Sequence, residues 1–416
     1  MKLILKIKET VKKHNLWRKN CLNLIASENL LSPLAKKYLI SDFLGRYNEH
    51  STKNGKFISH YQGTKFANEI EKICNKIFSQ KFSTPFVDTR AISGAVANLI
   101  VYRSFLNPGD FFLAPGLTFG GHVSSSHFGI AGICGLKSID LPFDEKNFQI
   151  DLERAIPLIK KTKPKLIMLG RSMFLRPEPI REIRKETEAI IVYDASHVFG
   201  LIFGKTFQDP FKEGADIITS STHKTFPGPQ GGIILAKKDF PIELWRKIQR
   251  TIFPGTISNH HIFRLPALAI TALEMKKFGK NYAKQTIKNA KILAENLFNF
   301  GFDVLGESFG FTQSHQVIVD VKKFGGGEVV AKKLERANII VNKMALPKDK
   351  PKDATKNPSG IRIGTQEVTR IGMKENEMKE IAKFFKEILI EKKNPAKVKK
   401  KVVAFKKNFQ KIHYCF

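Results

Sequence analysis

Short apolar runs alternate with amphipathic stretches between residues 65 and 275, and this alternation restricts the possible folds more than any other feature of the chain. The runs at 166–169 and 190–193 have the length and composition of buried strands, whereas residues 152–159 carry apolar side chains at helical spacing. Strands that alternate with helices predict an α/β domain with a mostly parallel sheet, because parallel neighbours need a crossover connection.

A different pattern begins near residue 280. Residues 281–300 carry an apolar face at helical spacing that ends at Gly301, and strand-like and helix-like stretches follow it. A chain of 416 residues is also longer than one hydrophobic core usually spans. We therefore predict three parts, which are an N-terminal arm at 1–50, a large domain at 51–280 and a smaller C-terminal α/β domain at 281–416.

The charge is strongly basic, since 70 Lys and Arg against 38 Asp and Glu give a net charge of +32. Clustered cations neutralise phosphates, so nucleic-acid binding is one interpretation. The excess is spread along the whole chain, however, and a solvated Lys-rich surface is favoured. Residues 391–416 hold nine Lys against one Glu, but their apolar residues recur at helical spacing, which favours a packed terminal helix over a basic arm.

Several classes of protein are disfavoured by what the sequence lacks. Four cysteines lie far apart, which argues against a disulfide scaffold and a Cys-rich zinc site, and we predict no metal. No apolar run reaches the ~18–20 residues of a membrane span. Residues 1–16 lack the apolar core of a secretory signal. We expect a cytoplasmic protein without a membrane partner.

The clearest chemical signal lies in residues 215–232. An apolar strand there ends in hydroxyl residues and is followed by His223, Lys224 and a Pro/Gly-rich turn. Burial can lower the pKa of such a lysine and suit it to Schiff-base formation, although a surface lysine is the alternative. Asp194 ends the strand-like run before it, where a carboxylate could hold a proton on a pyridine nitrogen or simply cap a helix.

Three further features fit the same ligand. Ser93 and Gly94 open an apolar helix, whose positive end favours a phosphate, although an ordinary N-cap is the alternative. His122 follows two glycines and could stack on a planar ring or fill a core position. Arg362 lies between small residues and suits a carboxylate or a structural salt bridge. A phosphate, a protonated ring nitrogen and an aldehyde bound by lysine together describe pyridoxal 5′-phosphate.

Five segments in order along the chain resemble serine hydroxymethyltransferases, and they are 23–29, 119–122, 194–197, 222–232 and 359–365. Gln230 and the ending at 413–416 look like the archaeal branch. The resemblance implies a fold-type I pyridoxal-phosphate enzyme, with a mostly parallel seven-stranded sheet in the large domain and a smaller C-terminal α/β domain. It also implies a homodimer with shared active sites that interconverts L-serine and glycine. The hydroxymethyl carbon would pass to a reduced pterin, either tetrahydrofolate or tetrahydromethanopterin.

By position, the resemblance assigns roles to individual residues. The catalytic residues would be Lys224, Glu49, His122 and His223. The cofactor would be bound by Lys224, Asp194, His197, Ser93, Gly94, His122, Ser172, Ser221 and the partner subunit's Gly255. The substrate would be bound by Arg362, Ser27, Tyr47 and Tyr61. The pterin would be bound by Leu117, Gly121, His122 and Val123.

Two alternatives stay open at this point. Met344 stands where the family usually has an Asn that contacts the pterin, so a carrier-independent aldolase of threonine or allo-threonine is the second hypothesis, and such an aldolase reaction is also expected as a side activity. A basic protein whose main role is nucleic-acid binding is the third hypothesis, and the ordered motifs disfavour it.

Overall fold

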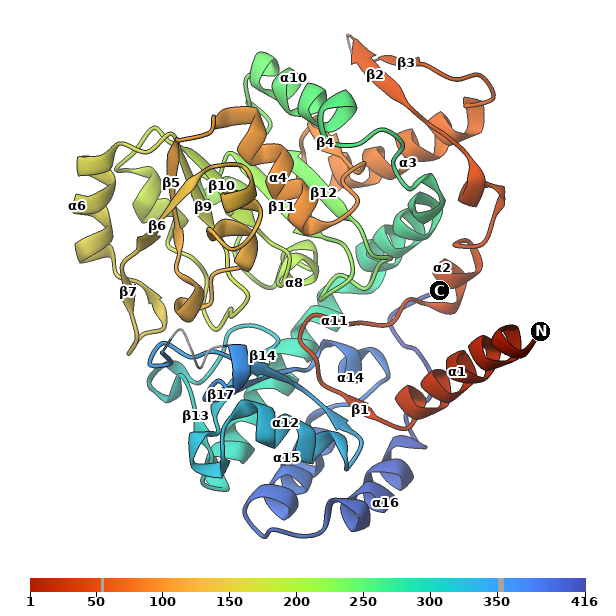
Figure 1. Cartoon of the computed structure of the whole chain (residues 1–416), viewed down its shortest axis with the longest axis vertical. Helices are drawn as coiled ribbons and strands as arrows, with labels where there is room; N and C mark the ends of the chain where they lie inside the picture. Colours follow the sequence, from red (N-terminus) through yellow and green to blue (C-terminus); the bar gives the residue numbers. More distant parts are fainter. Residues whose placement is uncertain (54–55, 351–354) are drawn as a thin grey trace. The chain divides into compact units, whose positions relative to one another are not determined.

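The computed structural model describes residues 1–53, 56–350 and 355–416 (Figure 1). The chain forms two compact units: residues 29–284 with 414–416, and residues 1–28 with 285–413. Helix α11 (Leu265–Asn299) runs through residue 280, where the sequence pattern changes. The three-part domain division expected from the sequence stays a prediction.

A seven-stranded sheet forms the centre of the unit at 29–284, with strand order β4-β12-β11-β10-β9-β5-β6. Strand β12 is antiparallel to both of its neighbours, and the other neighbouring strands pair in parallel. The predicted mostly parallel sheet is therefore confirmed. Its strands are β4 (Val87–Asp88), β5 (Phe111–Pro115), β6 (Lys137–Leu141), β9 (Leu166–Leu169), β10 (Ile190–Asp194), β11 (Ile217–Ser221) and β12 (Gly232–Ala236).

Helices surround this sheet (Figure 1). Its strands pack with them in a large apolar cluster. Fully buried side chains of α4, such as Ala97 and Val101, pack in one cluster with Ile217 of β11 and Trp245 of α10. Burying each large apolar side chain contributes about 1.5–3 kcal/mol, so this cluster holds the strands and helices together. The helices are α2 (Pro33–Lys37), α3 (Lys65–Phe82), α4 (Gly94–Phe105), α5 (Ile130–Ile133), α6 (Leu152–Thr162), α7 (Ile180–Arg184), α8 (Phe199–Phe203), α9 (Pro210–Glu213) and α10 (Ile242–Arg250).

Two small hairpins complete this unit. Strands β2 (His50–Lys53) and β3 (Lys56–Ser59) pair antiparallel just before helix α3. Strands β7 (Phe143–Asp144) and β8 (Gln149–Ile150) form the second pair, just before helix α6.

The second unit is built on a four-stranded antiparallel sheet with order β13-β14-β17-β16. A separate parallel pair joins β1 (Leu22–Asn23) to β15 (Ile339–Ile340). The sheet consists of β13 (Asp303–Val304), β14 (Gln316–Asp320), β16 (Asn342–Met344) and β17 (Gly360–Gly364). The helices are α1 (Lys2–Lys19), α12 (Gly327–Glu335), α14 (Gln366–Arg370), α15 (Glu375–Leu389) and α16 (Pro395–Lys406).

Helix α16 confirms the predicted packed terminal helix. The Asn394 side chain caps it by accepting a hydrogen bond from the Ala396 N–H at 2.9 Å. Val398 and Val402 are fully buried, whereas most of its lysines are exposed. The basic tail is therefore an amphipathic helix with a solvated Lys face.

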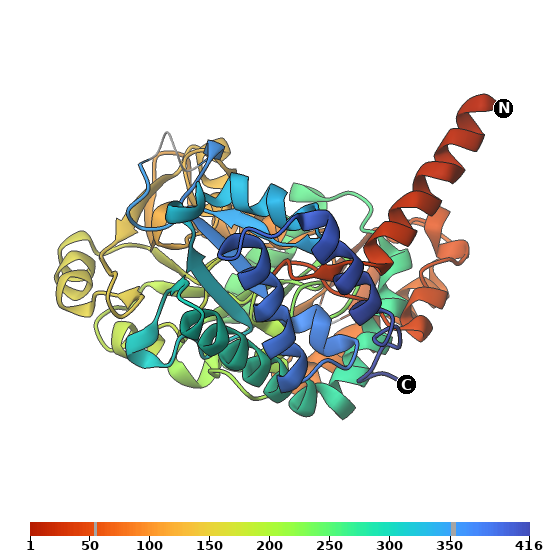
Figure 2. The same cartoon turned by 90° about the horizontal axis from the view of Figure 1, so that it is seen from below.

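Helix α1 is different, because none of its residues is buried. Figure 2 shows α1 extending away from the strands and helices of its own unit. Leu3, Ile4, Leu5 and Ile7 are 57–74% exposed. Across the residues that the structure describes, no helix is both long and apolar enough to cross a membrane.

Candidate active site

Most of the predicted site residues of the unit at 29–284 gather where the parallel strands end. Asp194 is the last residue of β10 and pairs in register with Thr219 of the adjacent β11. Ser221 ends β11, and Lys224 follows it after three residues. The carboxyl ends of parallel strands are where α/β proteins bind ligands. We call these residues the sheet-edge group, which consists of Ser93, Gly94, His122, Ser172, Asp194, His197, Ser221, His223 and Lys224.

The Asp194 carboxylate is held on both of its oxygens. Oδ2 accepts a hydrogen bond from Asn98 Nδ2 at 2.8 Å, and Oδ1 accepts one from the Ser196 N–H at 2.9 Å. Asn98 is fixed in turn, since its Oδ1 accepts from Thr219 Oγ1 at 2.6 Å. Each carboxylate oxygen has a further lone pair, so Asp194 is oriented and can still bind a cationic N–H of a ligand.

The same network reaches His122. The second N–H of Asn98 Nδ2 donates to Ser124 Oγ at 3.1 Å, and Ser124 Oγ lies 2.8 Å from His122 Nδ1. The Ser124 backbone N–H also donates to His122 Nδ1 at 3.2 Å. Asn98 therefore orients both the carboxylate and the imidazole predicted to contact the cofactor ring, and its two N–H groups and its oxygen are all used.

The N-terminus of α4 supplies a second part of the site. Ser93 caps this 12-residue helix by accepting a hydrogen bond from the Val96 N–H at 3.1 Å. A Cβ atom at Gly94 would lie only 3.0 Å from both Ser196 Oγ and the Ser221 backbone nitrogen. Glycine is therefore needed for the close approach of the helix to the end of β11. The positive end of the helix dipole lies beside that strand end, which suits a phosphate group.

Lys224 and His223 lie half-buried after β11. The Lys224 carbonyl accepts a hydrogen bond from Asn29 Nδ2 at 2.6 Å, and Asn29 also donates to Tyr282 OH at 2.8 Å. Burial and the neighbouring Lys224 charge lower the pKa of His223 to about 4, so its imidazole is neutral at neutral pH. Its buried Nδ1 has no hydrogen-bond partner within the described ranges and is available to a ligand.

The two remaining members of the group are fixed through their backbones. The His197 carbonyl accepts a hydrogen bond from Thr225 Oγ1 at 2.7 Å, which ties the segment after β10 to the segment after β11. The Ser172 N–H donates to the Gly120 carbonyl at 2.6 Å, so Ser172 lies beside the stretch that leads into His122.

A second set of predicted residues is brought together elsewhere in the same unit. The rings of Tyr47 and Tyr61 lie 5.2 Å apart and are 51% and 45% exposed. Ser258 Oγ donates a hydrogen bond to Glu49 Oε1, which ties Glu49 to the segment that follows Gly255. We call Tyr47, Glu49, Tyr61 and Gly255 the hairpin group, after the β2–β3 hairpin between them.

The residues predicted to bind the pterin lie around two short 3₁₀ turns, Leu117–Phe119 and Val123–Ser125. Leu117 and Val123 are exposed apolar side chains. A Cβ atom at Gly121 would collide with the Pro115 carbonyl, so this glycine permits the tight return of the chain between the two turns.

Arg362 and Ser27 belong to the other unit. Arg362 is buried in the centre of β17, and its Nε donates to Asn342 Oδ1 of β16 at 3.3 Å. Burial lowers the pKa of Arg362 to about 10, which still leaves the guanidinium charged at neutral pH. Ser27 follows a stretch that lies beside β17, because the Gly364 N–H donates to the Leu24 carbonyl at 2.7 Å.

Sequence reasoning missed the residues that orient this site. Asn98, Ser124 and Thr219 hold Asp194 and His122, and Asn29 holds the backbone of Lys224. The sequence signals for them were Asn98 at the start of an apolar helix, Asn29 in the segment 23–29 and Thr219 among the hydroxyl residues of 215–232, and none of these signals predicted the contacts.

The chain is similar to known proteins over nearly its whole length. The family model described as serine hydroxymethyltransferase matches residues 4–385. Serine hydroxymethyltransferases from Saccharolobus islandicus (strain M.14.25 / Kamchatka #1) and Sulfolobus acidocaldarius are each 49% identical over 415 residues, which cover 99% of this chain and 94% of those proteins. The crystal structure of L-threonine transaldolase from Pseudomonas fluorescens in its internal aldimine state is similar with a TM-score of 0.92. It is 29% identical, and the match covers 100% of this chain and 94% of that one.

Proposed function

The chain belongs to the serine hydroxymethyltransferase family of pyridoxal-phosphate-dependent transferases, and we propose that it transfers the hydroxymethyl carbon of L-serine to a reduced pterin and leaves glycine. The family resemblance, the fold-type I class and the cofactor predicted from the sequence are thereby confirmed. One observation carries the reaction proposed for this chain, namely that Asp194 ends β10 and Lys224 follows the adjacent parallel strand β11, beside the N-terminus of α4.

The residues of the sheet-edge group fit the cofactor. When bound, pyridoxal 5′-phosphate supplies an electron sink for the bonds at the substrate α-carbon. Lys224 would hold its aldehyde, Asp194 its ring nitrogen, and Ser93 with Gly94 its phosphate. His122 would contact the ring face. Ser172 and His197 would hold the phenolic oxygen, and Ser221 would complete the pocket.

The remaining residues would bind the amino acid and move its proton. Arg362 is a buried cation with a planar fork of donors, and it would bind the substrate carboxylate through two hydrogen bonds. That contact, together with Ser27, fixes which bond of the α-carbon is oriented for cleavage. Glu49 would take and return the hydroxyl proton of serine, and the neutral His223 would act as an uncharged hydrogen-bond partner.

We propose a homodimer in which the hairpin group completes the site of the partner subunit. Two observations support this proposal. Tyr47 and Tyr61 expose about half of their surface, and α1 exposes Leu3, Ile4 and Ile7 along a helix that buries none of its residues. Exposed apolar side chains gathered on one element are typical of a protein–protein contact.

Carrier-independent cleavage of 3-hydroxy amino acids is the second candidate function. The similar solved structure is named an L-threonine transaldolase, and Met344 of β16 stands where the family usually has Asn. Leu117, Gly121, His122 and Val123 would bind the pterin in the first candidate and would have no carrier to bind in the second.

The test is to incubate the cofactor-loaded protein with L-serine alone, with tetrahydrofolate and with tetrahydromethanopterin, and to measure the glycine formed. We expect glycine to form rapidly with one of the two carriers. A parallel incubation with L-threonine and allo-threonine, without carrier, measures the second candidate. Serine that stays unchanged with both carriers, alongside rapid threonine cleavage, would replace the first candidate by the second.

A further inference from the structure

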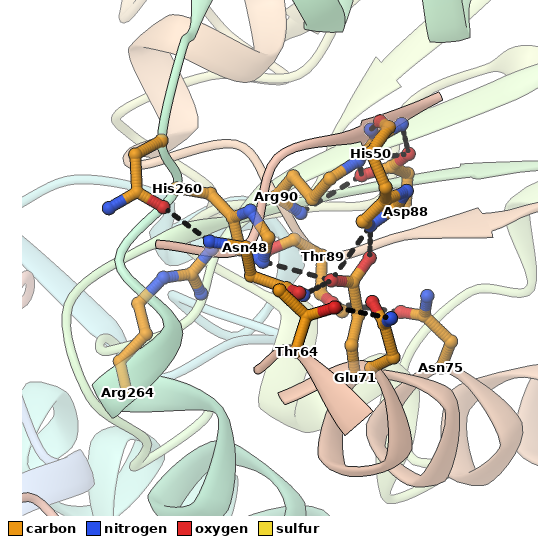
Figure 3. Close-up of polar contacts among 12 residues, drawn as sticks. Asn48, His50, Thr64, Glu71, Asn75, Asp88, Thr89, Arg90, His260 and Arg264 are labelled. Carbon is orange, nitrogen blue, oxygen red and sulfur yellow. Dashed lines mark hydrogen bonds and ion pairs between the residues drawn. The ribbon is translucent and has the colours of Figure 1, made fainter. Parts of the chain in front are cut away.

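A buried polar cluster surrounds the carboxylate of Glu71 on α3 (Figure 3). The Nε2 of His50 lies 3.0 Å from Glu71 Oε1, and the Nε2 of His260 lies 2.9 Å from Oε2. Asn48 Nδ2 donates to Oε2 at 3.1 Å. We call Asn48, His50, Glu71 and His260 the Glu71 cluster, and each of its side chains is at most 2% exposed.

The cluster depends on the negative charge of Glu71. Burial alone would raise the pKa of this carboxyl, but the charge and hydrogen bonds of His260 and His50 outweigh burial and hold the pKa well below its usual range. Asn48 and His50 thus hydrogen-bond to the ionised carboxylate, and His260 lies within ion-pair distance of it. A buried carboxylate is tolerated only with such partners, so breaking the set leaves polar atoms unpaired.

The partners of Glu71 lie next in sequence to Glu49 and to the residue that holds the Glu49 carboxylate. Asn48 and His50 are the residues on either side of Glu49. His260 is two residues after Ser258, and Ser258 donates the hydrogen bond that holds the Glu49 carboxylate. Glu71 therefore bonds both to the segment that carries Glu49 and to the segment that carries Ser258, the hydrogen-bond partner of Glu49.

Two further hydrogen bonds join these two segments. The side-chain oxygen of Asn259 accepts a hydrogen bond from the Asn48 N–H at 3.0 Å, and its Nδ2 donates to the Arg46 carbonyl at 3.2 Å. On the other side of Glu49, Arg90 Nη1 donates to the His50 carbonyl at 3.2 Å (Figure 3). Arg90 is itself fixed by a buried ion pair with Asp88 at 2.7 Å.

We propose that Glu71 is a positioning residue that sets the place of the Glu49 carboxylate for proton transfer during hydroxymethyl transfer. The inference rests on the proposed function, because it assumes that Glu49 handles the serine hydroxyl proton. Glu71 itself contacts Asn48, His50 and His260 and acts only through them. Misplacing a reacting group by about 1 Å can lower a rate ~10²-fold, so an exposed segment that carries one needs a rigid buried support.

Glu71→Gln is the first test, since it keeps the shape and removes one acceptor and the charge. We expect kcat for serine-to-glycine conversion to fall ~10²-fold, whereas the KM for serine and the visible absorbance of the bound cofactor stay unchanged. Asp216→Asn is the matched control. Asp216 is another buried carboxylate of this unit, paired with Arg184 at 2.5 Å just before β11, so its loss should lower the melting temperature and leave kcat unchanged.

A double-mutant cycle separates positioning from general destabilisation. We expect Glu49→Gln and the double variant Glu49→Gln/Glu71→Gln to have the same kcat, because Glu71 acts only through Glu49. Losses that multiply in the double variant would overturn the inference, and so would a Glu71→Gln protein with wild-type kcat. If Glu71→Gln does not fold, His260→Gln removes one partner of the carboxylate and takes its place in the cycle.

Amide hydrogen exchange provides a readout that does not depend on activity. We expect faster exchange at residues 46–50 and 258–260 in Glu71→Gln and not in Asp216→Asn. A wild-type protein that converts no serine with either carrier would refute the proposed function, and the exchange data would still decide whether Glu71 holds these two segments. Wild-type exchange at both segments in Glu71→Gln would overturn the inference whatever the activity.

Discussion

The sheet-edge group and the hairpin group reach their positions by different means. Asp194 and Ser221 end strands of a seven-stranded sheet, so the backbone hydrogen bonds of that sheet fix their places, and short side-chain contacts such as Asn98 to Asp194 refine them. Glu49 precedes a small hairpin, its neighbours Asn48 and His50 bond to the buried Glu71, and Ser258 holds its carboxylate. A reactive side chain at a strand end is positioned by the sheet, whereas one on an irregular segment needs buried polar support of its own.

The largest effect is expected from the sheet-edge group. Lys224→Ala removes the amine proposed to hold the cofactor, so we expect conversion of serine to fall more than about a thousandfold, with loss of the visible absorbance of the bound cofactor. The exposed Lys238 of the same unit offers a control, because Lys238→Ala should behave like the wild type. A Lys224→Ala protein that keeps its serine conversion and its cofactor absorbance would show that the sheet-edge group does not bind the cofactor.

Glu49→Gln tests the hairpin group. It should lower kcat about 10²-fold through loss of proton transfer and leave the cofactor absorbance unchanged, because the sheet-edge group is intact. Stopped-flow rates and absorbance spectra measure both properties. Glu69→Gln, at an exposed position on α3, is the control and should change neither. Loss of the cofactor from Glu49→Gln would mean that the two groups do not act separately.

Asn98→Ala tests whether the side-chain contacts around Asp194 contribute to cofactor binding. The variant leaves Asp194, Thr219 and Ser124 each without one partner, and an unpaired buried polar group costs about 1–3 kcal/mol. We expect cofactor affinity to fall about tenfold or more in an equilibrium titration. Asn147 also donates to an aspartate, at 2.6 Å, but it is exposed, so Asn147→Ala should leave the affinity unchanged.

The last expected effect concerns the pH dependence of stability and not the reaction. The folded protein holds the pKa of His223 at about 4, below the ordinary 6.5, so the unfolded chain binds this proton more readily. The contribution of this shift to the free energy of unfolding is present in full above pH 6.5 and is lost as the pH falls toward 4. His223→Asn should therefore lose less stability over that interval, by on the order of 2–3 kcal/mol in denaturant titrations. An exposed control, His127→Asn, should follow the wild type, and an equal slope in His223→Asn would contradict the shift.

The same contrast explains how far the sequence could predict the site. Strands β10 and β11 were predicted from apolar runs, so the places of Asp194 at the end of one and Lys224 just after the other could be inferred from the sequence. The assignments of Glu49 and Tyr61 came from family resemblance alone. Their support could not be inferred, because Glu71 meets His260 from far along the chain and no local pattern encodes that contact.

The spacing of apolar residues also predicted some helices better than others. Helix α15 is one of the helix-like stretches expected after Gly301, and it forms because its amphipathic spacing is regular and Glu375 and Glu377 lie in its first turn. Helix α11 begins at Leu265, well before the predicted start, because its first part is apolar on nearly every side and lacks the spacing that marks a surface helix.

The pairing of β1 with β15 has a consequence for biosynthesis. Leu22 pairs in register with Ile339, so β1 is synthesised more than three hundred residues before its partner strand. At about 5–20 residues per second, that interval is roughly 15–60 s. Throughout that interval, β1 and the exposed apolar side chains of α1 are accessible to chaperones and to other nascent polypeptides.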